Sequence, residues 1–135
     1  MIRKLLVATL CAASVAGCTP SETVEVSGVL TLKGQPIDQA EVMFNPITKG
    51  RLASGVTDAS GKFKLSTLKP DDGAMPGEYI VTLFEYYPPD KPPKMPPPGQ
   101  GLPSRFPPGY ADPGKSPLKA TVERGAKNEF SFTVP

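Results

Sequence analysis

The residues that most often carry out chemistry in proteins are scarce in this sequence. It contains no histidine among its 135 residues, and its two cysteines, Cys11 and Cys18, both lie near the beginning. Without imidazole the commonest general base is missing, and zinc sites that depend on imidazole are excluded. Chemistry at sulfur therefore depends on whether either cysteine remains in the mature protein. Other chemistry has to come from carboxylates, serines and lysines.

The carboxylates stand in positions typical of turns. Asp71 and Asp72 are adjacent, but they lie in a loop rich in turn-forming residues, which indicates a solvated turn rather than an acid and base pair. Asp58 and Ser60 resemble the start of a calcium loop, although lysines follow where oxygen ligands are needed. No serine or lysine stands in a motif that activates a nucleophile. The sequence therefore predicts no catalytic residues, no metal, no cofactor and no enzymatic activity.

Residues 1–17 have the pattern of a secretory signal. Arg3 and Lys4 precede a short apolar stretch, which ends in small residues. The stretch is too short to span a bilayer, since that takes about 20 apolar residues. We expect this signal to be removed, which leaves a short tether at residues 18–22 and one domain at residues 23–135.

The signal ends in the four residues Val15, Ala16, Gly17 and Cys18. They resemble a lipobox, the motif that lipoprotein signal peptidase recognises. The resemblance implies that Cys18 becomes the mature N-terminus and is the lipidation site, with acyl chains on its sulfur and its amine. The alternative is an ordinary signal peptide or membrane anchor in which the cysteine is coincidental. Since Cys11 lies in the removed part, we expect no free thiol and no disulfide in the mature protein.

The expected anchor holds the domain close to a membrane. Two or more acyl chains bind a bilayer stably, because each buried methylene contributes about 0.8 kcal/mol. Residues 19–22 extend to at most roughly 15 Å, at about 3.5 Å per residue. Thr19 rather than aspartate follows the cysteine, and by the sorting pattern known for many double-membrane bacteria this favours the outer membrane. We therefore expect a lipid-anchored protein of the bacterial cell envelope.

The charge balance argues against nucleic acid as a partner. The whole chain has 15 Lys plus Arg against 13 Asp plus Glu, a net charge of +2. Loss of Arg3 and Lys4 with the signal leaves 13 of each sign, so the mature protein is close to neutral. A neutral chain suggests neither a nucleic acid nor an anionic lipid surface as partner. The expected contact with the membrane is the lipid anchor alone.

Residues 23–135 alternate apolar and polar residues at period two, which predicts strands with one buried face. About seven short stretches show this pattern, the longest at residues 78–86, and a turn at residues 123–128 joins the last two strands as a hairpin. The fold class is therefore predicted to be all-β, a single antiparallel β-sandwich of immunoglobulin-like shape. The residues expected to face the core are Val24, Val26, Leu30, Leu32, Ala40, Val42, Phe44, Phe63, Leu65, Tyr79, Val81, Leu83, Leu118, Ala120, Val122, Phe130, Phe132 and Val134.

Several segments of this domain, within about residues 26–84, share a pattern of glycine turns and strands. They are Gly28 and residues 34–42, 57–63 and 76–81. With these segments the domain resembles the carboxypeptidase regulatory-like domain, a family of transthyretin-like β-sandwiches. Residues 110–113, followed by Ser116, further resemble small bacterial lipoproteins built on this domain. The resemblance implies a non-catalytic module, because in carboxypeptidases the domain accompanies the enzyme and lacks its active site.

A proline-rich connection at residues 87–117 interrupts the strand pattern. Residues 88–117 contain twelve of the eighteen prolines, which cannot donate to a sheet ladder and which favour extended polyproline II. One interpretation is a semi-rigid crossover between the central strand and the last two strands. The other is a presented ligand or docking surface, because proline-rich stretches bind aromatic grooves at little entropic cost.

The outward face of the strand at residues 78–86 is apolar, and a face of this kind needs a cover. We expect Phe106 and Tyr110, with some of the prolines, to fold back over it. If the face is open instead, it becomes the candidate partner surface. The residues of this candidate surface are Ile80, Phe84, Tyr86, Tyr87, Phe106 and Tyr110.

Two classes of function agree with this sequence. The preferred class is a structural or protein-interaction role, in which a lipid-anchored, non-catalytic sandwich binds another component of the envelope. The alternative is a small-molecule or glycan-binding module, whose shallow site is lined by Tyr86, Tyr87, Phe106 and Tyr110. Sugar recognition usually uses large aromatic platforms, and the chain contains no tryptophan. The partner is therefore expected to be an envelope protein or, in the alternative, a glycan.

Overall fold

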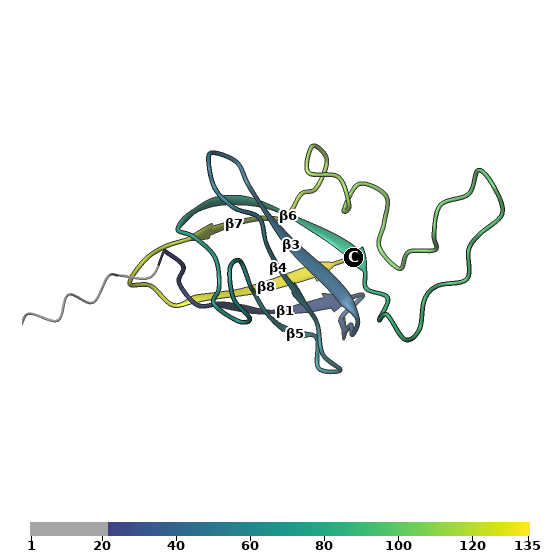
Figure 1. The fold of residues 1–135 in the computed structure, drawn as a ribbon, viewed down its shortest axis with the longest axis horizontal. Coiled ribbons are helices and arrows are strands. Elements are labelled where there is room, and N and C mark those ends of the chain that lie inside the picture. The colour runs from purple at the N-terminus through teal and green to yellow at the C-terminus, as the bar shows by residue number, and fades with distance from the viewer. Residues whose placement is uncertain (1–21) are drawn as a thin grey trace, which may run out of the picture.

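The computed structural model describes residues 22–135. The predicted signal at residues 1–17, the lipobox that ends at Cys18, and the tether up to residue 21 lie outside the described residues. No helix in the described part of the chain is long and apolar enough to cross a membrane. The described residues form eight β-strands and no α-helix, and Figure 1 shows how the strands are arranged.

The strands form two sheets that pack face to face. In the first sheet β8 lies on one side of β1, and β2 and β5 share the other side; the second sheet has the order β4-β3-β6-β7. The predicted all-β sandwich is confirmed. The strands are β1 (Val26–Leu32), β2 (Gln35–Pro36), β3 (Ala40–Pro46), β4 (Ala53–Val56), β5 (Lys62–Lys64), β6 (Gly77–Glu85), β7 (Lys119–Val122) and β8 (Asn128–Val134).

The first and last strands run parallel to each other, starting from the pair Val26 and Asn128. β7 pairs with β6 in the other sheet, so the predicted hairpin of the last two strands is wrong. The link between them crosses from one sheet to the other. It is held by the side chain of Asn128, which accepts a hydrogen bond from Glu123 N at 3.0 Å and donates one to Glu123 O at 2.9 Å. A hairpin and a crossover require the same alternation of apolar residues, so the pattern did not distinguish them.

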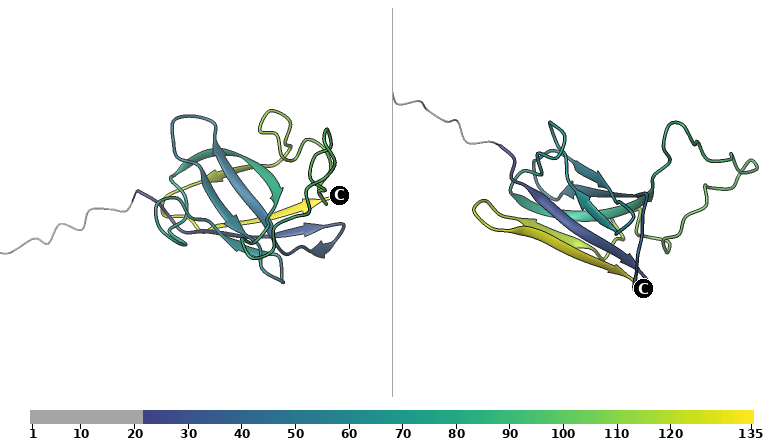
Figure 2. Two further views of the ribbon diagram at one scale, coloured as in Figure 1. Left: turned by 45° about the vertical axis from the view of Figure 1, so that its right-hand side comes forward. Right: turned by 90° about the horizontal axis from the view of Figure 1, so that it is seen from below.

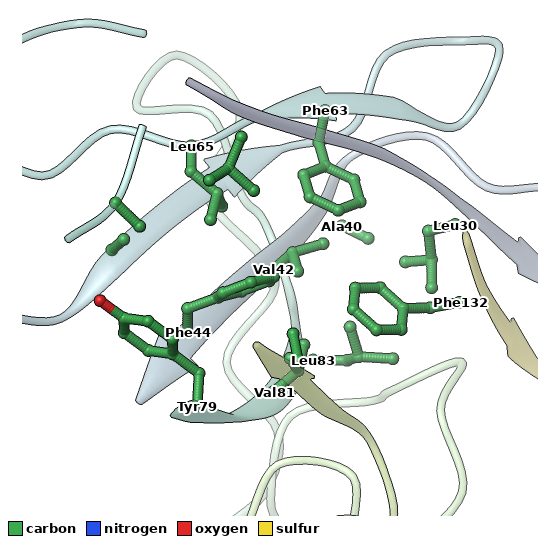
Figure 3. Packing of buried hydrophobic residues seen from close by; sticks show 14 of the residues in the cluster. Leu30, Ala40, Val42, Phe44, Phe63, Leu65, Tyr79, Val81, Leu83 and Phe132 are labelled. Carbon is green, nitrogen blue, oxygen red and sulfur yellow. The ribbon is translucent and has the colours of Figure 1, made fainter. Parts of the chain in front are cut away.

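Aromatic rings dominate the core between the sheets. The ring of Phe44 lies 5.6 Å from that of Tyr79 and 6.1 Å from that of Phe132, measured between centroids, and Figure 3 shows Phe44 beside Tyr79. All the residues expected to face the core are either buried or packed against the buried cluster. Core residues that the pattern did not predict are Ile37, Ala53, Ala74 and Phe106.

Gly28 permits close packing of rings in the first sheet. It pairs with Phe63 on β5 and with Phe130 on β8. A Cβ atom at this position would lie 2.5 Å from the ring of Phe63 and 2.5 Å from the carbonyl oxygen of Phe130. Phe63 in turn stacks on Phe132, with centroids 6.2 Å apart and ring planes 9° apart. A side chain at position 28 would therefore displace this stack.

Candidate functional site

The proline-rich connection between β6 and β7 has two parts. Residues 88–102, called the proline-rich loop below, project beyond the end of β6 and away from the two sheets (Figures 1 and 2). Residues 105–118, called the docked segment, lead back along the sandwich to β7. β6 and β7 are direct neighbours, with Ile80 opposite Lys119. The connection therefore leaves and rejoins the same edge of the second sheet.

The docked segment occupies the edge of β6 that β7 leaves open. β7 pairs only with the first part of β6, up to Ile80. Beyond that point the amide of Val81 donates to the carbonyl of Leu118 at 2.9 Å, and the amide of Leu83 donates to the carbonyl of Tyr110 at 2.9 Å. The hydroxyl of Ser116 donates to the carbonyl of Val81. The segment thus satisfies backbone groups that a strand edge would otherwise expose.

Phe106 is the apolar anchor of the docked segment. It is 7% exposed and belongs to the core cluster, and the half-buried Tyr110 packs against that cluster. The sequence predicts that both residues cover the outward face of β6, but Phe106 lies in the core between the sheets. Because it is buried, Phe106 is not available to a partner. Its position could not be found by period-two alternation, because it lies outside any strand.

The outward face of β6 is closed largely by its own neighbours. Ile80 and Phe84 are half-buried there, and Thr82 between them is 1% exposed. The side-chain amide of Asn45 on β3 donates to the hydroxyl of Thr82 at 3.0 Å and to the carbonyl of Ile80 at 3.1 Å. Phe84 lines a small pocket of about 250 Å³ together with residues such as Leu102. This face therefore lacks the open apolar patch that a partner surface of this kind requires.

Arg105 fixes the beginning of the docked segment to the end of β6. Its guanidinium forms a two-point contact with the carboxylate of Glu85, with Nε 3.1 Å from Oε1 and Nη2 2.7 Å from Oε2. Nη2 also donates to the carbonyl of Asp38 at 2.8 Å, and Nη1 lies 3.6 Å from the Asp38 carboxylate. Hydrogen bonding to Glu85 raises the pKa of Arg105 above its ordinary value. The side chain of Glu85 is only 12% exposed, so Arg105 supplies the countercharge that it needs.

The same guanidinium stabilises a strained link between β2 and β3. Gln39 has a φ of 51°, in the left-handed region that residues with a Cβ atom disfavour. Its carbonyl accepts hydrogen bonds from the amide of Tyr86 at 2.9 Å and from Arg105 Nη2 at 3.2 Å. Three separate parts of the chain are therefore joined at the base of the proline-rich loop. Sequence reasoning missed Arg105, because no spacing rule pairs it with Glu85.

The proline-rich loop adds nothing to the core. Each of its residues is exposed or half-buried, and Met95 is 84% exposed. Backbone hydrogen bonds close one turn at residues 88–91 and another at residues 97–100. The hydroxyl of Tyr87 donates to the carbonyl of Pro103 at 3.1 Å. This bond closes the neck of the loop, so that its two ends lie together.

The carboxylates singled out in the sequence stabilise turns. Asp58 accepts hydrogen bonds from the hydroxyl of Ser60 at 2.8 Å and the amide of Lys62 at 3.0 Å, which lower its pKa. Burial acts to raise the pKa of Asp72, but three amides of residues 67–69, at 2.7 to 3.0 Å, together lower it. A lowered pKa means that the ionised carboxylate stabilises the fold. This contribution is present above the ordinary aspartate pKa and is lost as the pH falls through the lowered value.

A groove of about 850 Å³ runs over the outer side of the first sheet, next to β4. No residue of the candidate partner surface lines it. Within residues 22–135 no three side chains of His, Cys, Asp or Glu lie close enough together to hold a metal ion. Polar residues that line the groove include Ser27, Ser54, Asp58, Lys62, Lys64, Ser66, Glu129 and Ser131.

The structure brings together only part of the candidate partner surface. Tyr86 and Tyr87 lie where the proline-rich loop begins, and Phe84 precedes them at the end of β6, whereas Ile80 lies farther along the strand. Comparisons with protein-family models, with curated proteins and with solved structures find no match to this chain. The exposed proline-rich loop projects from a base at which Arg105 binds Glu85.

Proposed function

We propose that this protein is a lipid-anchored protein of the bacterial cell envelope, at the outer membrane, with a non-catalytic β-sandwich that serves in protein interaction. The resemblance of residues 15–18 to a lipobox supports the anchor. The similarity of residues 26–84 to the carboxypeptidase regulatory-like domain supports a non-catalytic module. The observation that carries the interaction role is the placement of the proline-rich loop at the end of the sandwich opposite the one where the described chain enters it (Figure 1).

This opposition follows from the course of β6. Its first residue, Gly77, lies near the end where the chain enters the sandwich, because Val24 pairs with Ala74 just before it. Its last residue, Glu85, lies at the base of the proline-rich loop. A nine-residue strand spans about 30 Å at about 3.3 Å per residue. An acylated Cys18 thus anchors one end of the sandwich, and the loop extends from the other end, away from the bilayer.

Incorporation of labelled fatty acid tests the anchor. The unmodified protein and the Cys11→Ala variant are both expected to take up label, because Cys11 lies in the part of the signal that is removed. Cys18→Ala is expected to take up none and to leave the membrane fraction. Equal labelling of the Cys18→Ala variant would contradict the lipid anchor. Cleavage of peptide, ester or glycoside substrates by purified protein that lacks residues 1–18 would contradict the non-catalytic role.

The groove over the first sheet favours a second candidate, a small-molecule or glycan-binding module. Its volume of about 850 Å³ and its serine and lysine side chains suit a polar ligand. Titration with soluble peptidoglycan fragments, followed by NMR of the backbone amides, checks this candidate. Shifts at Ser27, Lys64 and Ser131 would support it, whereas an unchanged spectrum at these three positions would exclude these fragments as ligands.

A further inference from the structure

The proline-rich loop leaves and rejoins the rest of the protein at its neck. Its ends meet at the bond between the Tyr87 hydroxyl and the Pro103 carbonyl, 3.1 Å long. The docked segment, which begins at Arg105, already returns the chain to β7. Residues 88–102 are therefore an excursion that starts and finishes at one place. Because none of them is buried, the core between the two sheets gains no packing from their presence.

The middle of the loop is stiff and its backbone is unpaired. Its prolines stand in two runs, the pair Pro92–Pro93 and the triplet at residues 96–98, separated by Lys94 and Met95. Consecutive prolines favour polyproline II, which has no internal hydrogen bonds. Among the described residues, no hydrogen bond to residues 92–96 is present. Their carbonyl groups are therefore free to accept hydrogen bonds from another molecule, and little entropy is lost when the segment binds.

The charges of the loop are also unpaired. Lys91 and Lys94 carry positive charge on either side of one proline pair, and Asp90 carries the only negative charge, so the net charge of the loop is +1. None of the three forms an ion pair with the described residues. Met95, between the two proline runs, is 84% exposed. The loop thus presents apolar rings, one exposed apolar side chain and two cations on a rigid base.

We infer that the proline-rich loop is the binding element of the proposed interaction role, and that its partner is an envelope protein with an aromatic groove edged by carboxylates. Proline rings pack on aromatic side chains, and the free carbonyls accept hydrogen bonds from the groove. Carboxylates at its edge pair with Lys91 and Lys94, which sets orientation and specificity. The inference rests on the proposed function and adds the binding element and the class of partner.

Photocrosslinking in intact cells tests this inference with the full-length chain. A photoreactive amino acid replaces Met95 in the loop, and the matched control replaces Leu68, which is 51% exposed in the turn after β5. A protease-sensitive adduct is expected from position 95 and not from position 68. A third photoreactive variant at Ser131, in the groove over the first sheet, samples another face.

Two sets of substitutions sharpen the test. Changing Pro93, Pro96 and Pro97 to alanine is expected to reduce the adduct about fivefold or more, because the segment loses its preorganisation. Lys91→Glu combined with Lys94→Glu is expected to reduce it about tenfold, because the new charges repel the carboxylates. Lys49→Glu, in the exposed loop between β3 and β4, is the charge control and should leave the adduct unchanged. Thermal unfolding of each variant confirms that the sandwich is intact.

Four outcomes would overturn the inference. Adducts from Leu68 or Ser131 without one from Met95 would leave an interaction role but remove the loop from it. An adduct from Met95 that survives the proline and lysine substitutions would exclude the proposed mode of recognition. An adduct that resists protease and disappears with a glycan hydrolase would replace the protein partner by a glycan. No adduct from any of the three positions would contradict both the inference and the proposed protein-interaction role.

Discussion

The two parts of the proline-rich connection are both rich in proline, but the docked segment packs against the sandwich and the proline-rich loop projects from it. The docked segment places Phe106 in the core, binds Glu85 through Arg105 and accepts hydrogen bonds from amides of β6. The proline-rich loop has no buried residue and no ion pair with the described residues. Proline content therefore does not decide whether such a segment packs. A few anchoring side chains do.

The difference also shows how a segment with many prolines can cover a strand edge. Proline removes a donor, but the backbone keeps all its carbonyl acceptors. The amides of Val81 and Leu83 need acceptors, which the carbonyls of Leu118 and Tyr110 provide. The docked segment therefore supplies acceptors for the amide donors of β6, although it is not a β-strand. The loop faces no such row of donors, and the carbonyl acceptors of residues 92–96 stay open.

Loss of the apolar anchor, Phe106, is expected to lower the unfolding free energy more than any other change to the two parts of the connection. Phe106→Ala removes a ring that is 7% exposed, and truncations of this kind cost about 3–5 kcal/mol of unfolding free energy. Met95→Ala, the matched change in the loop, should stay within about 0.5 kcal/mol of the unmodified protein. Urea denaturation of residues 19–135 measures both values. Similar losses for the two variants would mean that the loop and the docked segment are equally integrated.

Removal of the guanidinium is expected to have the next largest effect. Arg105→Ala leaves the nearly buried carboxylate of Glu85 without a countercharge and is expected to cost about 1.5–3 kcal/mol. Arg105→Lys should recover only part of this, because an ammonium group cannot form the two-point contact. Lys94→Ala in the loop is the control and should change nothing measurable by the same denaturation. A fully stable Arg105→Ala variant would show that the contact between Arg105 and Glu85 does not stabilise the fold.

Loss of a single hydrogen bond in the docked segment is expected to have a smaller effect. Ser116→Ala removes the donor to the carbonyl of Val81, in a residue that is 8% exposed. The expected cost is about 1 kcal/mol, measured by thermal unfolding. Ser131→Ala, at an exposed position on β8, serves as the control for the change from serine to alanine. If both variants unfold at the same temperature, the hydroxyl of Ser116 does not hold the segment.

Opening the neck of the loop is expected to have the smallest effect on stability. Tyr87→Phe removes only the exposed bond to the carbonyl of Pro103, and its cost should lie below about 0.5 kcal/mol. The loop should nevertheless become more mobile, since this bond joins its two ends. Order parameters from NMR relaxation at Gly99 and Gln100 are expected to fall while those at Val81 stay constant. Unchanged values at all three positions would show that the bond does not restrain the loop.

Much of the fold follows from the sequence, because alternation at period two reports which face of a strand is buried. Tyr79, Val81 and Leu83 are buried as the pattern predicts. Alternation reports neither the direction of a strand nor the sheet to which it belongs. The parallel pair of β1 and β8 was missed for this reason, and the last two strands were wrongly joined as a hairpin. Local signals cannot predict a pairing between the two ends of the chain.

The site was less predictable than the fold. The sequence identified the proline-rich connection and its aromatic residues, but it gave no means of dividing the connection into a docked and a projecting part. That division depends on Phe106 entering the core and on Arg105 meeting Glu85, two contacts between residues far apart in the chain. The lipobox prediction at Cys18 lies outside the described residues. Labelling of the protein in cells is therefore its test.

Replacing residues 89–102 by two glycines tests most directly whether the proline-rich loop is independent of the sandwich. The neck is already closed by Tyr87 and Pro103, and a shorter loop has a smaller closure entropy. The unfolding free energy of this variant, measured by urea denaturation, is therefore expected to equal that of the unmodified protein within about 0.5 kcal/mol. A loss of about 2 kcal/mol or more, similar to that expected for Arg105→Ala, would contradict this account and make the loop a structural crossover.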